Sequence, residues 1–362
     1  MKDISGLIGS LNGYLGWNKA RVACFVHMLL GLFAVRSINL QEIALGFGGK
    51  AKVPSRYRRL QRFFAQFEID FTQIARWIFK LYFRDDQKFY LLIDRTNWYW
   101  GKKKINIFML SIAYEGMAIP LFWSMLPKAG SSNFKERKEL LSLFIDTFGV
   151  KGIHRLLADR EFGSGEFFRW LNKRNIPFCI RIKEGSMACI RAKKFLKAKK
   201  LFNHLPLKSS TVFNMAVEIF GEKVYLAGAR SERGELMIVA TNAEPKIAIV
   251  SYLRRWEIES LFQCLKGRGF NFEATHITDL NRLAKLTALL AIGFIWAHKV
   301  GEWKAEIKPI IWKQFLNQKR PQYSYFRYGL DCIREVILQI YDKFRELKGH
   351  FLLILPKPGV SI

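Results

Sequence analysis

The chain has 362 residues, of which 50% are apolar, so it is long enough for two or three structural units around a sizeable core and is not disordered. Its formal net charge is +29, from 59 basic and 30 acidic side chains. Folding does not require that excess, so the charge predicts a polyanionic partner. Nucleic acid is favoured over a membrane surface because the basic residues are spread along the whole chain.

Cysteine usage and hydropathy exclude further classes. The chain has 5 Cys that are far apart and form no CxxC pair, and its 6 His show no ligand spacing. Reduced thiols of a cytoplasmic protein are expected, without a structural zinc site. The N-terminus shows no signal-peptide pattern. The longest apolar run, Thr287 to Ala297, is too short to span a bilayer and predicts a buried helix, so no membrane is expected as a partner.

Residues 1–85 are predicted to form a helical domain. Trp17 to Val35 and Leu40 to Phe47 read as helices, and Gly48-Gly49 ends the second. A third helix begins near Pro54 and is rich in arginine. A short helix, a glycine turn and an Arg-rich helix are typical of a helix-turn-helix DNA reader, although an ordinary bundle with a basic solvated face is the alternative. The predicted DNA-binding residues of this helix are Arg56, Arg58, Arg59 and Arg62.

From Phe89 the pattern changes to strands. The sequence predicts strands over 89–100, 104–114, 117–125, 154–158 and 176–182, and helices over 133–148 and 164–175. Glu115-Gly116 is a tight hairpin signal, and Asn133 and Gly149 are a plausible N-cap and stop of the first helix. This order predicts an α/β fold with a ribonuclease-H-like mixed sheet and flanking helices.

The remaining boundaries follow from shifts in composition. A basic and then strand-like stretch, with turns at Gly221 and Gly234, interrupts the alternation as a β-rich insertion. After Asp279 the chain is predicted to be helical to about Glu346, with breaks at Pro309 and Pro321. The expected domains are 1–85, helical and DNA-binding; 86–183, the first part of the catalytic core; 184–243, the insertion; 244–300, the second part of the core; and 301–362, a helical C-terminal region.

Tyr252 to Lys266 has no Pro or Gly and predicts a continuous helix. At 100° per residue, Tyr252, Arg255, Glu259 and Lys266 fall within an arc of roughly 60°. A salt-bridged surface is the plain alternative, because Arg255 and Glu259 are an i,i+4 pair.

Two acids upstream favour a catalytic interpretation of Glu259. Asp94 ends the first strand of the predicted sheet and Asp159 ends the fourth, so the two are expected to be neighbours. Three carboxylates suit Mg²⁺, with Mn²⁺ as a substitute, and two such ions clamp the attacking and leaving oxygens of a phosphoryl transfer. An acid at a strand end is a weak signal alone. Other acids lie close by, namely Asp85, Asp86, Glu161 and Glu257.

These motifs resemble those of the bacterial cut-and-paste transposases of the insertion-sequence-four family. The resemblance lies in DRTNW around Asp94, LADREFG around Asp159, and the spacing Tyr-x2-Arg-x3-Glu-x6-Lys from Tyr252 to Lys266. It covers roughly residues 85–300, and Trp256 matches the family's usual aromatic residue.

The resemblance implies a DDE transposase with Asp94, Asp159 and Glu259 as its catalytic, metal-binding triad. Tyr252, Arg255 and Lys266 would hold phosphates of the transposon end, beside Trp256. The reaction would nick the end, form and open a hairpin, and join the end to target DNA. The expected partners are double-stranded terminal inverted repeats, target DNA, and a second copy of the chain on the DNA ends. The expected location is the bacterial cytoplasm, on the nucleoid when DNA is bound.

Two other interpretations stay open on the sequence. One is a metal-dependent endonuclease or resolvase of the same fold, and the other is a domesticated DNA-binding protein. Relatives place a tryptophan in the insertion against the hairpin, but no Trp occurs here between Trp170 and Trp256. One of Phe213, Phe220 and Tyr225 is therefore expected to be exposed toward the active site, the alternative being that all three are core residues.

Overall fold

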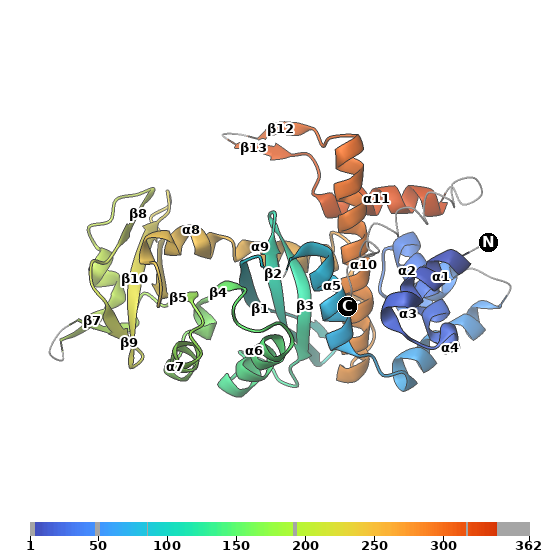
Figure 1. Cartoon of the computed structure of the whole chain (residues 1–362), viewed down its shortest axis with the longest axis horizontal. Helices are drawn as coiled ribbons and strands as arrows, with labels where there is room; N and C mark the ends of the chain where they lie inside the picture. The colour runs from blue at the N-terminus through green and yellow to red at the C-terminus, as the bar shows by residue number, and fades with distance from the viewer. Residues whose placement is uncertain (1–3, 48–50, 85, 191–193, 316–317, 339–362) are drawn as a thin grey trace. The chain divides into compact units, whose positions relative to one another are not determined.

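The structure, a computed structural model, describes residues 4–47, 51–84, 86–190, 194–315 and 318–338. These residues divide into two compact units (Figure 1). The first unit contains Met1–Phe83, Trp98–Ile105 and Phe262–Ile362, and the second contains Arg84–Asn97 and Asn106–Leu261.

Helices build most of the first unit. They are α1 (Ser5–Leu15), α2 (Lys19–Val35), α3 (Leu40–Gly46), α4 (Val53–Gln66), α5 (Phe71–Tyr82), α10 (Leu280–Ile307) and α11 (Tyr325–Leu338). Side chains before three of the helices accept backbone N–H groups and fix where each helix begins. Asn18 accepts from Ala20, Asn39 from Gln41, and Asp70 from Thr72 and Gln73.

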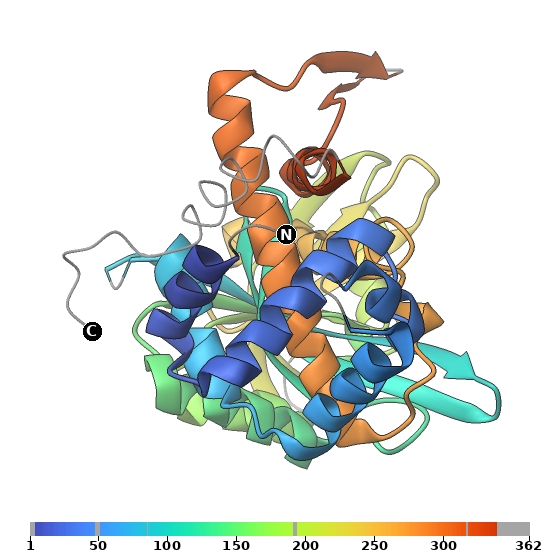
Figure 2. The same cartoon turned by 90° about the vertical axis from the view of Figure 1, so that its right-hand side faces the viewer.

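The core of the first unit forms around α10, which Figure 2 shows running among the N-terminal helices. The predicted buried run lies within this helix, and every residue from Leu286 to Ala297 is buried. Helix α10 is long and apolar enough to cross a membrane, but 89% of its most apolar window is buried inside the protein. Its apolar surface is therefore accounted for by packing. The N-terminal helices thus share one unit with α10 and α11.

Two glycines allow α10 and α11 to approach closely. A Cβ atom on Gly301 would lie 1.8 Å from the Tyr325 carbonyl oxygen, and one on Gly329 would lie 1.8 Å from the Ala297 carbonyl oxygen. Any larger side chain would force the helices apart.

The segment after α10 corrects a prediction. Helix was expected between the breaks at Pro309 and Pro321, but β12 (Trp312–Phe315) and β13 (Gln318–Pro321) form an antiparallel hairpin there. Trp312 and Ile311 are exposed, so this segment lacks the buried stripe that stabilises a helix. The predicted helix after residue 338 lies outside the described residues.

The second unit contains the sheet. Its first five strands are β1 (Phe89–Trp100), β2 (Lys103–Tyr114), β3 (Met117–Met125), β4 (Ile153–Ala158) and β5 (Phe178–Ile182). They lie in the order β3-β2-β1-β4-β5, with β2 antiparallel to β3 and with β1, β4 and β5 parallel. This is the ribonuclease-H-like order, so the predicted fold class is confirmed. The last residues of β1 and the first of β2, Trp98–Ile105, belong to the first unit.

The segment 184–243 adds strands to the same sheet. They are β6 (Met187–Cys189), β7 (Phe195–Lys197), β8 (Ser209–Val212), β9 (Val217–Ile219), β10 (Glu222–Arg230) and β11 (Leu236–Thr241). Strand β11 pairs antiparallel with β5, and β10 pairs with β11. The segment is therefore continuous with the edge of the five-stranded core.

Helices of the second unit connect and cover these strands. They are α6 (Phe134–Phe148), α7 (Gly165–Lys173), α8 (Ala248–Leu253) and the first part of α9 (Trp256–Leu265). A capping box between Asn133 and Glu136 begins α6, and Gly149, with φ 75°, follows its end as predicted. Helix α8 packs against β4, β5, β10 and β11, which holds the segment before Glu259 against the sheet.

Candidate active site

The parallel pairing of β1 with β4 brings the two aspartates together. Ile93 on β1 pairs with Ala158 on the parallel strand β4. Asp94 and Asp159 each follow one of these paired residues, so both lie where the pairing of the two strands ends. Asp159 comes directly after β4, whereas Asp94 lies within β1, which continues to Trp100. The sequence predicted that Asp94 would end its strand, and in this respect the prediction was wrong, because β1 runs on past it as a long hairpin strand.

A single guanidinium group joins the first and third acids. Arg255 Nη1 donates to Asp94 Oδ2 at 3.1 Å, and its Nη2 donates to Glu259 Oε1 at 2.7 Å. The second aspartate joins through Tyr252, whose hydroxyl donates to Asp159 Oδ1 at 3.1 Å. Arg255 Nε in turn donates to the Tyr252 hydroxyl at 3.1 Å. The three predicted acids, the tyrosine and the arginine therefore form one connected cluster.

The cluster depends on a break that the sequence did not predict. The helix expected from Tyr252 to Lys266 is interrupted at Arg254 and Arg255, between α8 and α9. Bonds from residue i to i+3 replace the i+4 ladder there, as in Arg255 N–H to the Tyr252 carbonyl and Ile258 N–H to the Arg255 carbonyl. The tighter turn places the Arg255 side chain against Tyr252, so the ideal helical wheel does not apply across this step.

Burial makes the electrostatics of the cluster strong. The side chains of Arg255 and Asp94 are 6% and 17% exposed, and that of Glu259 is 38% exposed. Burial raises the pKa of Asp94 to about 6, against the opposing effects of Arg255 and the Arg95 backbone N–H. Burial also lowers the pKa of Arg255, but Tyr252, Asp94 and Glu259 outweigh it and raise that pKa overall. The arginine is therefore held in its charged form by the acids that it joins.

A second ion pair links the two aspartate motifs. Arg95, which follows Asp94, binds both carboxylate oxygens of Glu161 at 2.6 Å, and Glu161 lies two residues after Asp159. Arg95 also donates to Asn106 Oδ1 at 3.0 Å and to the Gly130 carbonyl. From the sequence, Glu161 was expected to be only one of several acids near the predicted triad. The available signal was that an acid follows Asp159 closely in DREF while an arginine follows Asp94 in DRT, so that the two side chains could pair.

The other nearby acids have separate partners. Glu257 is buried and accepts from Arg254 Nε at 2.8 Å, and Asp86 forms a 4.0 Å ion pair with Arg84 at the surface. Asp85 lies outside the described residues. Neither described acid joins the cluster around Arg255.

Two further predicted residues lie at the two ends of α9: Trp256 is its first residue and Lys266 follows its last. Trp256 is 58% exposed, and the Arg255 guanidinium lies 5.6 Å from its ring centre. Lys266 belongs to the first unit, where its ammonium group pairs with Glu273 at 2.8 Å and lies 5.2 Å from the Trp98 ring centre. An exposed aromatic ring next to the acids is a surface on which a base can stack.

Of the three aromatic residues of the insertion, Phe220 contacts the Asp159 motif. Its ring lies beside Gly163, which follows the 3₁₀ turn Arg160–Phe162, and it packs edge-on against Phe168 at 5.8 Å. Phe220 is 39% exposed and Tyr225 is 38% exposed, whereas Phe213 is half-buried.

The four predicted arginines of α4 are not equivalent. Arg56 donates to the carbonyls of Ala51 and Phe47, and Arg59 donates to the carbonyl of Ala20 and lies over the Phe47 ring. Arg58 and Arg62 are exposed. Arg56 and Arg59 therefore already stabilise the fold of the first unit, whereas Arg58 and Arg62 are free to contact DNA at the surface.

The donor set of the cluster suits a hard divalent cation. Carboxylate oxygens are the ligands that Mg²⁺ and Mn²⁺ prefer, and here two carboxylates contact Arg255 and the third contacts Tyr252. Across the part of the chain that the structure describes, no three His, Cys, Asp or Glu side chains converge closely enough to hold a metal ion as they stand. Arg255 supplies the positive charge between two of the acids.

The ribonuclease-H-like sheet thus carries one carboxylate within its first strand and another directly after its fourth, and such carboxylates can hold the metal ions that assist phosphodiester cleavage. Residues 87–295 match the family model described as the transposase DDE domain. The match covers more than half of the chain, which therefore belongs to the transposase DDE domain family. The protein is a transposase, an enzyme that cleaves and transfers DNA strands.

Other comparisons add less. Among solved structures, the chain is similar to the piggyBac transposase in a cryo-EM structure of its synaptic complex with hairpin DNA. The sequence identity is 12% and the TM-score 0.46, over 99% of this chain and 85% of that one. A search of curated protein sequences finds no significant match.

Proposed function

We propose that the chain is a cut-and-paste transposase of the bacterial insertion-sequence-four family, with Asp94, Asp159 and Glu259 as its catalytic triad. The observation that carries this proposal is the convergence of these three acids on the Arg255–Tyr252 pair. They come from β1, the end of β4 and α9, which are far apart in the sequence. A salt-bridged surface would not need acids from three elements at one end of a sheet.

We propose that the three acids hold divalent metal ions, Mg²⁺ with Mn²⁺ as a substitute. Such ions, when bound, stabilise the charge on the attacking and leaving oxygens. Arg255 must then exchange at least part of its contact with Asp94 and Glu259. A DNA phosphate is the natural new partner, because a guanidinium group matches its oxygens in a bidentate way.

Tyr252 and Trp256 complete the proposed end-binding site. The Tyr252 hydroxyl is a donor already directed at the acid cluster, and the exposed Trp256 ring is a stacking surface beside it. Lys266 is proposed to hold a phosphate as well, in exchange for Glu273. The substrates would be the double-stranded inverted repeats and target DNA, with two copies of the chain on paired ends. The location would be the bacterial cytoplasm, on the nucleoid when DNA is bound.

The test of this function is cleavage of a duplex that carries the inverted repeat abutting the gene. With Mg²⁺, the protein should first nick one strand and then produce a hairpin, seen as a slow band on a denaturing gel. Chelation of the metal should abolish both products and leave DNA binding. Cleavage to open ends without any hairpin would contradict the proposed intermediate, and cleavage in excess chelator would contradict the metal.

Phe220 is proposed as the aromatic platform for a base that leaves the stack at the hairpin turn. Its exposed ring contacts the loop that follows Asp159. Extrusion of a base costs a few kcal/mol, and stacking on a ring offsets about 1–3 kcal/mol of that cost. Phe220→Ala should therefore slow hairpin formation roughly 5- to 150-fold, with nicking nearly unchanged.

Tyr225→Ala is the matched control, since Tyr225 is equally exposed and no contact with the Asp159 loop is seen for it within the described residues. Equal loss of nicking and hairpin formation in Phe220→Ala, with a lower melting temperature, would mark Phe220 as a packing residue instead.

A further inference from the structure

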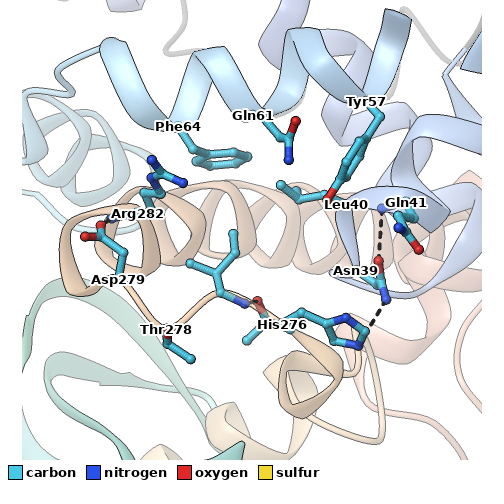
Figure 3. Close-up of a pocket in the computed structure, with 12 residues that line it drawn as sticks. Asn39, Leu40, Gln41, Tyr57, Gln61, Phe64, His276, Thr278, Asp279 and Arg282 are labelled. Carbon is cyan, nitrogen blue, oxygen red and sulfur yellow. Dashed lines mark hydrogen bonds between the residues drawn. The ribbon is translucent and has the colours of Figure 1, made fainter. Parts of the chain in front are cut away.

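One groove in the first unit gathers basic residues from two distant parts of the chain. Arg58, Gln61 and Arg62 lie on the exposed face of α4, at helical spacings of three and four. Arg282, in the first turn of α10, lines the same groove. A pocket of about 280 Å³ adjoins it, and Gln61 and Arg282 line this pocket as well (Figure 3). The groove and the pocket are therefore one continuous concave surface.

The three guanidinium groups of this surface are uncompensated. Within the described ranges, no carboxylate forms an ion pair with Arg58, Arg62 or Arg282, and all three residues are exposed. Arg56 and Arg59 differ, because backbone carbonyls already accept their N–H groups. Like charges that share one groove repel each other, and a polyanion in the groove removes that cost.

One carboxylate also faces the pocket, and its role is local. Asp279 Oδ1 accepts the backbone N–H of Arg282 at 2.8 Å as the N-cap of α10. Its negative charge is held at the positive end of a helix dipole, where it is most stabilised. Among the described residues Asp279 forms no ion pair with any of the three arginines that line the groove.

The Gln61 amide is placed to contact a base. Figure 3 shows it extending from α4 into the pocket, between Tyr57 and Phe64. It forms no hydrogen bond with any other side chain or backbone group that the structure describes. An amide offers a donor and an acceptor together, which matches the edge of an adenine in the major groove.

We propose that Arg58, Gln61, Arg62 and Arg282 form the surface that reads terminal-repeat DNA, the three arginines on phosphates and Gln61 on a base edge. The inference rests on the proposed end-binding function. It assigns to α10 a DNA contact that lies outside α4, and it assigns Arg56 and Arg59 to the fold. Helix α4 is then the helix that enters the major groove of the DNA, as the second helix of a helix-turn-helix does.

The test measures binding of the full-length protein to two duplexes over a range of salt concentrations, with chelator present so that no strand is cut. One duplex carries the inverted repeat abutting the gene, and the other has the same composition in shuffled order. Arg58→Ala, Arg62→Ala and Arg282→Ala should each lower the slope of log affinity against log salt by about 1, equally on both duplexes. Arg282→Lys should restore the slope.

Gln61→Ala should behave differently from the arginine variants. Loss of one base contact costs about 1–3 kcal/mol, so affinity for the inverted repeat should fall roughly 5- to 150-fold. Affinity for the shuffled duplex and the salt slope should not change. Arg76→Ala is the matched control, because Arg76 is an exposed arginine on α5 of the same unit. It should match the wild type on both duplexes.

The outcomes separate this inference from the function on which it rests. If the wild type binds both duplexes equally, the proposed end-binding function fails. If the wild type prefers the repeat but Arg282→Ala keeps the wild-type slope, or Gln61→Ala weakens both duplexes alike, the function stands and the assigned surface is wrong.

Discussion

Arg255 orders the candidate site because it is buried and contacts two of the three acids directly. Removal of one partner from a buried pair leaves the other charge desolvated, so each member constrains the rest. The same argument applies to Arg95 and Glu161, which join β1 to the 3₁₀ turn after β4. Arg255 thus constrains Asp94 directly, and the Arg95–Glu161 pair joins the chain segments next to Asp94 and Asp159.

We predict that Glu161→Ala lowers both stability and cleavage. The Arg95 side chain is 11% exposed and would lose its bidentate partner, at a cost of about 2–3 kcal/mol in the free energy of unfolding. Urea unfolding and end cleavage with Mg²⁺ would measure the two effects. Glu166→Ala is the control, since Glu166 is exposed in the following helix. A Glu161→Ala protein as stable as this control would show that the pair is not needed.

At the scale of elements, apolar runs bounded by turn signals predicted β1 to β5, because strands that are buried in a sheet leave such runs in the sequence. The succession of these strands and helices predicted the ribonuclease-H-like order. The same pattern placed Asp159 directly after a strand, as observed, but it also placed Asp94 at a strand end, whereas Asp94 lies within β1. The break at Arg254 and Arg255 left no such mark, since neither residue disfavours a helix. At this break Arg255 contacts Tyr252 and the acids, and a local pattern does not contain such tertiary contacts.

The contact between α10 and α11 gives a prediction at this scale. Gly329→Ala should lower the free energy of unfolding by more than about 2 kcal/mol, because its Cβ would meet the Ala297 backbone at 1.8 Å. Gly13→Ala is the opposite case, since Gly13 lies in α1 with open space around it. It should stabilise the protein by about 0.5–1 kcal/mol. Thermal unfolding measures both variants. A shift of the melting temperature in the same direction for both would contradict this packing.

At the scale of the molecule, the net charge of +29 correctly indicated a DNA-acting protein, and the motifs identified the class. Composition could not show that Arg282 would face α4, because the two lie more than 200 residues apart in the sequence. Nor could it show that the helices of residues 4–83 share a core with α10. Such pairings depend on which apolar faces meet, and many arrangements satisfy the same local pattern.

Stability should fall in acid through a buried histidine. Burial lowers the pKa of His298 to about 3, despite Glu302 at 3.4 Å, and the Tyr82 hydroxyl lies 3.2 Å from its ring. The unfolded chain therefore takes up a proton below about pH 6.5 that the folded chain does not. The contribution of His298 to the free energy of unfolding is constant above that pH. It falls by about 1.4 kcal/mol per pH unit as the pH drops toward the pKa of the folded state.

His298→Gln should flatten this dependence, even if it lowers stability at neutral pH. Urea unfolding of both proteins at several pH values between about 4 and 7 would compare the two slopes. Parallel slopes would show that His298 is protonated to the same extent in the folded and unfolded states.

The most direct measurement of the central claim compares cleavage and binding by Asp94→Asn, Asp159→Asn and Glu259→Gln on the inverted-repeat duplex. Each change removes a charged ligand oxygen and keeps the side-chain volume. Because the charge stabilisation at such a site is worth several kcal/mol, each variant should lose nicking and strand transfer with Mg²⁺ by a factor of about 1,000 or more. Binding should stay close to that of the wild type. Near-wild-type cleavage by any one of the three variants would remove that residue from the proposed triad.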